Sequence, residues 1–202
     1  MKRRYKFVYP VVWLFMRIFF PFKIIGKEKL SSSDHLIVYS NHISLLDPIF
    51  LVIAFGGKRP IYYMAKQELF ENKFLGWLIK KFGAFPVNRS DGGMALKSAI
   101  EVINDKKAMG IFPEGTRSKT GKLGRAKTGI AYIMSKSGAN AQPIAIISKN
   151  QKVRIFRKTT MVVCDEIDRS EITYDDSDRS SLRAFSSRLM QPIADVIEKY
   201  KK

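Results

Sequence analysis

The stretch HLIVYSNHISLLDPIF, residues 35–50, joins a short apolar run to a polar turn and then to the start of an apolar helix. The run LIVY has the length and branched residues of a strand buried on both faces, as strands of parallel sheets are. Pro48 is typical of the first turn of a helix, and the apolar segment 48–57 closes on two glycines. The stretch therefore predicts a buried strand, a polar junction and a helix, the first half of a β-α-β unit.

The same alternation of short strand-like and longer helix-like stretches continues to the C-terminus. Strands are predicted in 61–66, 84–88, 108–112, 142–148 and, as one or two strands, in 153–167. Helices are predicted over 68–83, 91–107 with Asp91 as its N-cap, 128–138 and 181–200. Strands separated by helices form right-handed crossovers, so we predict an α/β fold with a mainly parallel sheet and helices on both faces.

Polar residues follow four of the predicted strands. The strands lead into SNHISLLD (40–47), AKQEL (65–69), VNRS (87–90) and FPEGTRS (112–118). Open α/β sheets bind their ligands at the carboxyl ends of the strands. We therefore expect these four polar stretches to converge on one edge of the sheet and to form the functional site.

The charge balance indicates an anionic partner. Thirty-six Lys and Arg against 18 Asp and Glu give a net charge of +18. Between Gly115 and Cys164 there are eleven basic residues and no acidic one. Such an excess fits nucleic acid, an acidic membrane surface, phosphorylated substrates or an acidic carrier protein. A surface that is basic without a specific partner is the alternative.

The N-terminal segment, residues 1–24, has the composition of a membrane-associating helix. Its basic start precedes an apolar run over 7–20, which Pro10 and Arg17 interrupt. A bilayer span needs about 20 apolar residues, and no small-residue cleavage site marks a signal peptide. Aromatic residues beside Lys and Arg suit the headgroup boundary, so we expect an interfacial helix against anionic lipid ahead of one domain, 25–202. A buried helix docked on that domain is a compatible alternative.

Residue counts disfavour thiol and metal chemistry. Cys164 is the one cysteine, which excludes an internal disulfide, and it lies in a strand-like apolar run. We expect a buried structural thiol. The two histidines, His35 and His42, have no paired His or Cys spacing, so no metal site is predicted.

His42 and Asp47 are the candidates for acid–base chemistry. An imidazole can take a proton at neutral pH, and a carboxylate on its other nitrogen fixes the tautomer. Five residues on an ideal helix are about 140° apart, so only a turn running into a helix can join the pair. Two positions apart on a helix, Ser44 and His42 point in different directions, which favours direct transfer without an enzyme nucleophile. The alternative is that Asp47 and Pro48 merely begin a helix.

The second candidate set is FPEGTRS, residues 112–118. A glycine lets backbone approach a ligand, Thr116 offers a hydroxyl, and Arg117 can grip a phosphate through two bonds. Arg89, after the strand 84–88, adds a second cation on the same edge. A structural salt bridge between Glu114 and one arginine is the alternative.

These motifs resemble those of the 1-acylglycerol-3-phosphate acyltransferase (PlsC-like) family of glycerolipid acyltransferases. NHISLLD (41–47) is similar to its N-H-x4-D motif, and FPEGTRS to its second motif without a departure. The block 65–89 resembles the intermediate motif, except that Lys73 or Phe74 stands where many members have proline. QPIAI resembles the fourth block, so the resemblance covers about residues 25–150.

The resemblance implies transfer of a fatty acyl group from coenzyme A or acyl carrier protein to the free hydroxyl of a lysophospholipid. It implies that His42 is the general base and that Asp47 orients it. The implied substrate-binding residues are Asn41, Lys66, Arg89, Glu114, Gly115, Thr116 and Arg117. Neither a metal nor a bound cofactor is implied, since the acyl thioester is a substrate.

Within this resemblance we favour the synthesis of phosphatidic acid from lysophosphatidic acid at the cytoplasmic face of the cell membrane, by a peripheral or monotopic protein. Glycerol 3-phosphate and other lysolipids are alternative acceptors. A non-catalytic binder of membranes or nucleic acid is a rival from another class; nucleic acid is not an expected partner of the enzyme. Acyl-chain length, donor choice and oligomeric state do not follow from the sequence.

Overall fold

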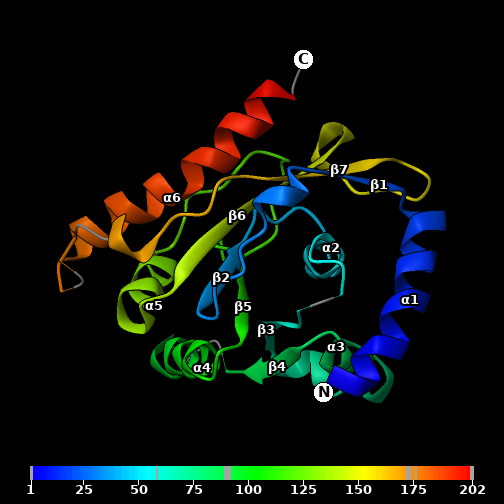
Figure 1. Cartoon of the computed structure of the whole chain (residues 1–202), viewed down its shortest axis with the longest axis horizontal. Coiled ribbons are helices and arrows are strands. Elements are labelled where there is room, and N and C mark those ends of the chain that lie inside the picture. The colour runs from blue at the N-terminus through cyan, green and yellow to red at the C-terminus, as the bar shows by residue number, and fades with distance from the viewer. Residues whose placement is uncertain (1, 58, 89–91, 172–173, 176, 201–202) are drawn as a thin grey trace.

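The computed structural model of the chain describes residues 2–57, 59–88, 92–171, 174–175 and 177–200. In these residues seven strands form one sheet in the order β1-β7-β6-β2-β5-β3-β4 (Figure 1). The strands are β1 (Phe22–Ile25), β2 (Leu36–Tyr39), β3 (Ile61–Lys66), β4 (Ala84–Val87), β5 (Ala108–Ile111), β6 (Asn140–Ser148) and β7 (Thr159–Val163). The α-helices are α1 (Lys2–Phe19), α2 (Asp47–Ala54), α3 (Lys73–Lys81), α4 (Gly92–Asn104), α5 (Gly129–Ser137) and α6 (Arg179–Lys199). Short 3-10 helices are η1 (Lys27–Lys29), η2 (Gln67–Phe70), η3 (Lys149–Gln151) and η4 (Arg169–Glu171).

The sheet is mainly parallel, as predicted. β6, β2, β5, β3 and β4 pair with their neighbours in parallel, with Val38 of β2 aligned with Gly110 of β5 and Gln142 of β6. β7 runs antiparallel to β6, and β1 pairs in parallel with β7. The sheet therefore begins at Phe22, inside the N-terminal segment 1–24, because β1 reaches β7 along one edge.

Helices cover both faces of the sheet, which confirms the predicted fold class. Ile37 and Tyr39 of β2 pack with buried residues of α4, α5 and α6. Leu36 and Val38 point the other way and pack with α2 and with Met16 of α1. Successive side chains of a strand point to opposite faces, so a strand that is apolar throughout needs helices on both sides. This explains why LIVY has no polar residue.

The helix predicted over 68–83 is divided into η2 and α3. Asn72 causes the division, because its side chain accepts a hydrogen bond from the Leu75 N–H at 3.0 Å and caps a new helix start. The segment 153–167 contains one strand, β7, and the predicted N-cap Asp91 lies outside the described residues. Cys164 is buried and free, as expected, and burial raises the pKa of its thiol to about 11.

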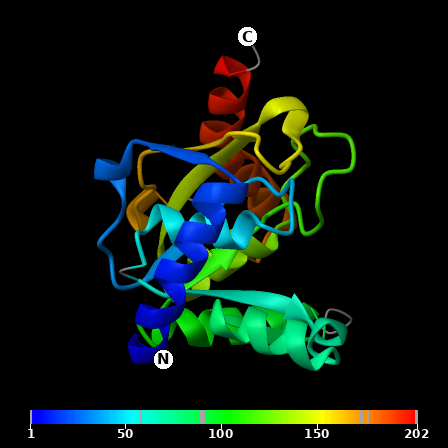
Figure 2. The same cartoon turned by 90° about the vertical axis from the view of Figure 1, so that its right-hand side faces the viewer.

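α1 packs against the body of the protein along one side (Figure 2). Met16 is 1% exposed within the core, and the ring of Tyr9 lies against Gly57. None of the described helices has the length and apolar character needed to cross a membrane. Met16 and Tyr9 dock one side of α1 on the domain, whereas Val11, Leu14 and Ile18 of the same helix are exposed.

Candidate active site

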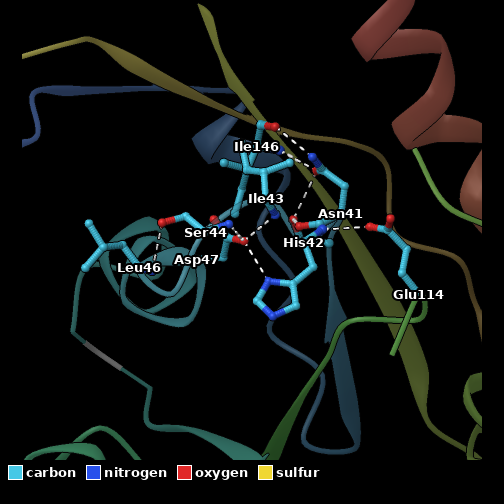
Figure 3. A network of polar contacts seen from close by, with 9 residues as sticks. Asn41, His42, Ile43, Ser44, Leu46, Asp47, Glu114 and Ile146 are labelled. Carbon is cyan, nitrogen blue, oxygen red and sulfur yellow. Dashed lines mark hydrogen bonds and ion pairs between the residues drawn. The ribbon is translucent and has the colours of Figure 1, made fainter. Parts of the chain in front are cut away.

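The polar junction after β2 is held by bonds to its neighbouring strands. Asn41 is 1% exposed, and its side-chain amide donates to the Ile146 carbonyl and accepts from the Ile146 N–H, both at 2.8 Å (Figure 3). The Ser40 N–H donates to the Ile111 carbonyl of β5. Asn41 thus joins the end of β2 to β6 and fixes the position from which the next residue, His42, projects.

His42 and Asp47 form a hydrogen-bonded pair, with 2.7 Å between Nδ1 and Oδ2 (Figure 3). The same carboxylate oxygen accepts the backbone N–H groups of Ile43 and Ser44, each at 2.7 Å. A turn therefore closes the five-residue spacing. Asp47 is the first residue of α2 rather than its N-cap, which is Leu46, so its carboxylate serves the turn and the histidine.

The environment of the pair sets its chemistry. Asp47 is fully buried, while the His42 side chain is 17% exposed. Burial raises the pKa of Asp47, and the hydrogen bonds from His42, Ser44 and Ile43 partly oppose this effect. An ionised carboxylate can only accept, so Nδ1 carries the proton and Nε2 is the nitrogen able to take one.

Phe112 and Tyr63 form an aromatic stack on one face of the His42 ring. The His42 and Phe112 rings are 4.2 Å apart at 18°, and Tyr63 stacks on Phe112 at 6.2 Å and 16°. The Tyr63 hydroxyl donates to the Pro48 carbonyl at 3.1 Å, in the first turn of the helix that carries Asp47. A Cβ at Gly110 would lie 2.0 Å from the Tyr63 ring, so only glycine leaves room for it.

Sequence reasoning missed Tyr63 and Gly110. A glycine inside a buried strand often marks a close approach by another group, and Gly110 carried this signal within the predicted strand 108–112. The partner of that glycine depends on the strand order, which placed β3 beside β5.

Glu114 ties the second motif to the first. One carboxylate oxygen accepts the His42 N–H at 2.7 Å (Figure 3). The other accepts the Gly124 N–H, also at 2.7 Å. The Ser118 N–H donates to the His42 carbonyl at 2.8 Å. Glu114 is 8% exposed, and burial raises its pKa against the effect of the two N–H donors. Among the described residues, Glu114 binds these backbone groups rather than an arginine, so it acts as a brace between the two loops.

The remaining predicted binding residues follow strands of the same edge. Gly115 has φ +74°, a conformation that favours glycine, and the Lys127 side chain lies against it. Thr116 and Arg117 are exposed in the same loop. Lys66 is exposed at the last position of β3, and Arg89 lies outside the described residues. The structure thus brings His42, Asp47 and Glu114 into contact and puts the exposed cations at the carboxyl edge.

The sequence also matches known proteins. The model of the Acyltransferase family matches residues 21–147. The 1-acyl-sn-glycerol-3-phosphate acyltransferase of Bacillus subtilis is 29% identical over 180 residues, which are 88% of each chain. The chloroplastic 1-acyl-sn-glycerol-3-phosphate acyltransferase LPAT1 of Arabidopsis thaliana is 32% identical over 152 residues, which are 72% of this chain and 42% of that protein. The chain therefore spans less than half of this plant relative.

A solved structure shows the same fold. The 1-acyl-sn-glycerophosphate (LPA) acyltransferase PlsC from Thermotoga maritima aligns with 99% of this chain and 78% of that chain, with a TM-score of 0.70 and 23% identity. Because the family model matches more than half of the chain and includes both motifs, the chain belongs to the Acyltransferase family.

Proposed function

We propose that the protein is a 1-acylglycerol-3-phosphate O-acyltransferase, which transfers a fatty acyl group from a thioester to the sn-2 hydroxyl of lysophosphatidic acid. The observation that supports this most is the hydrogen bond between His42 and the buried Asp47, at the carboxyl edge of a domain that matches the Acyltransferase family. The relatives named for this reaction support the choice of acceptor.

In the proposed reaction, Nε2 of His42 removes the proton from the acceptor hydroxyl as its oxygen attacks the thioester carbonyl carbon. The tetrahedral intermediate collapses, the C–S bond breaks, and the thiolate takes the proton from the imidazolium. Asp47 stabilises the imidazolium through the 2.7 Å bond to Nδ1. General base catalysis of this kind contributes roughly 10²–10⁴-fold to the rate.

The cations of the carboxyl edge bind the acceptor phosphate in this proposal. Arg117 makes the bidentate contact, with Arg89 and Lys66 as further cations. Gly115 and Thr116 shape the pocket, and Glu114 holds their loop against the backbone of His42. Asn41 positions His42 and does not contact the substrate in this proposal, because both the nitrogen and the oxygen of its amide are bound to Ile146. Backbone N–H groups beside the two motifs stabilise the oxyanion.

The proposed partners are anionic. Coenzyme A and acyl carrier protein both suit the net charge of +18, and the acyl thioester is a substrate rather than a bound cofactor. We propose that the N-terminal segment 1–24 lies at the cytoplasmic face of the cell membrane. Its support is an outward stripe on α1, formed by Val11, Leu14, Phe15 and Ile18, each at least 50% exposed.

An acyl-transfer assay with pure protein tests this function. Acyl-CoA and acyl carrier protein donors are each combined with lysophosphatidic acid, glycerol 3-phosphate and lysolipids of other headgroups. Phosphatidic acid from lysophosphatidic acid, at a kcat/KM well above that of the other acceptors, is the expected product. A higher kcat/KM for another acceptor would refute the proposed substrate, and binding without transfer to any of them would refute the enzyme.

A further inference from the structure

A second apolar surface lies on α3. We define the α3 face as Phe74 and Trp77 with Leu69 of η2, which are 74%, 53% and 38% exposed. The Phe74 and Trp77 rings are stacked, with centroids 6.4 Å apart. Large aromatic side chains exposed together on one helix are costly in water and mark an interaction surface.

The packing of α3 forces this face outward. Gly76 is buried, and a Cβ there would lie 3.0 Å from the Phe70 backbone, so the helix is seated closely on η2 through this residue. Phe82, just beyond the helix, is also buried. Phe74 and Trp77 are three positions apart, so their side chains lie on one side of the helix. That side is turned away from the contact that Gly76 makes with η2, so neither ring reaches the core.

The positive charge of α3 favours an anionic partner. The helix carries Lys73, Lys80 and Lys81 and no acidic residue. Glu68 and Glu71 lie beside Leu69, so the lysines of α3 leave this surface with a net positive charge. The Lys81 ammonium lies 5.5 Å from the centre of the Trp77 ring, so the cation sits beside the exposed aromatic. Tryptophan and lysine together are typical of the headgroup level of a membrane. A second copy of the chain would bring like charges together, whereas an anionic leaflet complements them.

The α3 face lies near the edge of the sheet that holds the proposed catalytic residues. β3 ends at Lys66 on the carboxyl edge, and η2 and then α3 follow it immediately, beside β4 (Figures 1 and 2). A leaflet that covers the α3 face therefore lies close to the edge that holds His42. Since the proposed acceptor is a membrane lipid, its hydroxyl has a short path from the leaflet to the base.

We infer that the α3 face docks on an anionic lipid leaflet as a second contact beside the N-terminal segment. This inference rests on the membrane part of the proposed function and is independent of the acyl-transfer step. The chain has two tryptophans, so Trp77 of the α3 face becomes the single fluorophore once Trp13 of α1 is replaced.

The test measures fluorescence quenching by vesicles with brominated acyl chains, of phosphatidylglycerol or of phosphatidylcholine. In the Trp13→Phe variant, Trp77 is expected to shift to the blue and to be quenched by the anionic vesicles, with less effect from the zwitterionic ones. The Trp77→Phe variant gives the response of Trp13, which packs against Phe22, as the background. An unshifted and unquenched Trp77 in the presence of anionic vesicles that bind the protein would overturn the inference.

Affinity provides the second measurement. Phe74→Ala is expected to weaken binding to phosphatidylglycerol vesicles by about tenfold, because one exposed aromatic no longer enters the lipid. Tyr200→Ala removes an aromatic that is 41% exposed at the far end of the molecule from α3 and should leave binding unchanged (Figure 1). Equal affinity of Phe74→Ala and the wild type would overturn the inference. Acyl transfer to a monomeric short-chain acceptor tests the reaction separately, so its failure is distinguishable from a failure of docking.

Discussion

Replacing Asp47 by asparagine separates the charge of the carboxylate from its shape. The Ile43 and Ser44 N–H groups hold one oxygen of Asp47 at 2.7 Å, and the asparagine oxygen can accept both bonds. It therefore still faces Nδ1 of His42, so the ring keeps its orientation and tautomer. What is lost is the negative charge beside the imidazolium that forms during transfer.

The expected loss follows from the strength of a charge-assisted hydrogen bond. A bond to a charged partner contributes about 1.5–3 kcal/mol, so the kcat of Asp47→Asn should fall roughly 10- to 150-fold with little change in either KM. The rate of product formation with saturating donor and acceptor measures it. Asp34→Asn, which changes an exposed carboxylate, is the matched control.

Stability should respond differently from activity. Burial raises the pKa of Asp47, so the folded state favours the protonated group, and the cost of the ionised carboxylate appears as pH rises through that value. Asparagine avoids this cost but buries an amide where Oδ1 has no hydrogen-bond partner among the described residues. We expect the free energy of unfolding of Asp47→Asn near neutral pH to stay within about 1 kcal/mol of the wild type. In acid, where protonation of Asp47 stabilises the wild type, the variant should be the less stable of the two. A kcat within about threefold of the wild type would refute the stabilisation of the imidazolium by the charge of Asp47, and a large loss of stability would make the role of the carboxylate structural.

Three further substitutions test the surroundings of the pair. Gly110→Ala puts a methyl group into the Tyr63 ring, so it should cost about 1–3 kcal/mol of stability and lower kcat. Gly92→Ala, whose Cβ meets nothing within 4 Å, is the control. If Gly110→Ala has the kcat and the unfolding curve of the wild type, the Tyr63 stack does not support His42. Glu114→Gln leaves one acceptor for two N–H groups and should cost about 1–3 kcal/mol in urea unfolding and reduce kcat, whereas wild-type values would show that the brace is dispensable. Arg117→Ala should chiefly raise the KM for the phosphorylated acceptor in steady-state kinetics, and an unchanged KM would make this arginine structural.

The sequence predicted the frame of the site because its signals are local. The apolar run before Ser40 and the proline after Asp47 defined the strand and helix without any knowledge of their neighbours. The bond between His42 and Asp47 could not be derived from their spacing, because it depends on a turn that two backbone N–H groups stabilise. That turn is positioned by Asn41, whose partner Ile146 is 105 residues away in the chain.

Contacts between strands could not be predicted from the sequence, for a related reason. The stack of Tyr63 on Phe112 requires β3 to lie beside β5, and the alternation of strands and helices leaves that order open. The division of the predicted helix 68–83 depended on the side chain of Asn72, which reads as an ordinary polar residue until its bond to Leu75 is known.

The two histidines of the chain allow a direct test of the central claim that His42 is the base. The measurement is the initial rate of phosphatidic acid formation from acyl thioester and lysophosphatidic acid by pure wild type, His42→Ala and His35→Ala. We expect His35→Ala to retain the wild-type rate and His42→Ala, with an unchanged circular dichroism spectrum, to lose roughly 10²–10⁴-fold or more. Near-normal turnover by folded His42→Ala would contradict it.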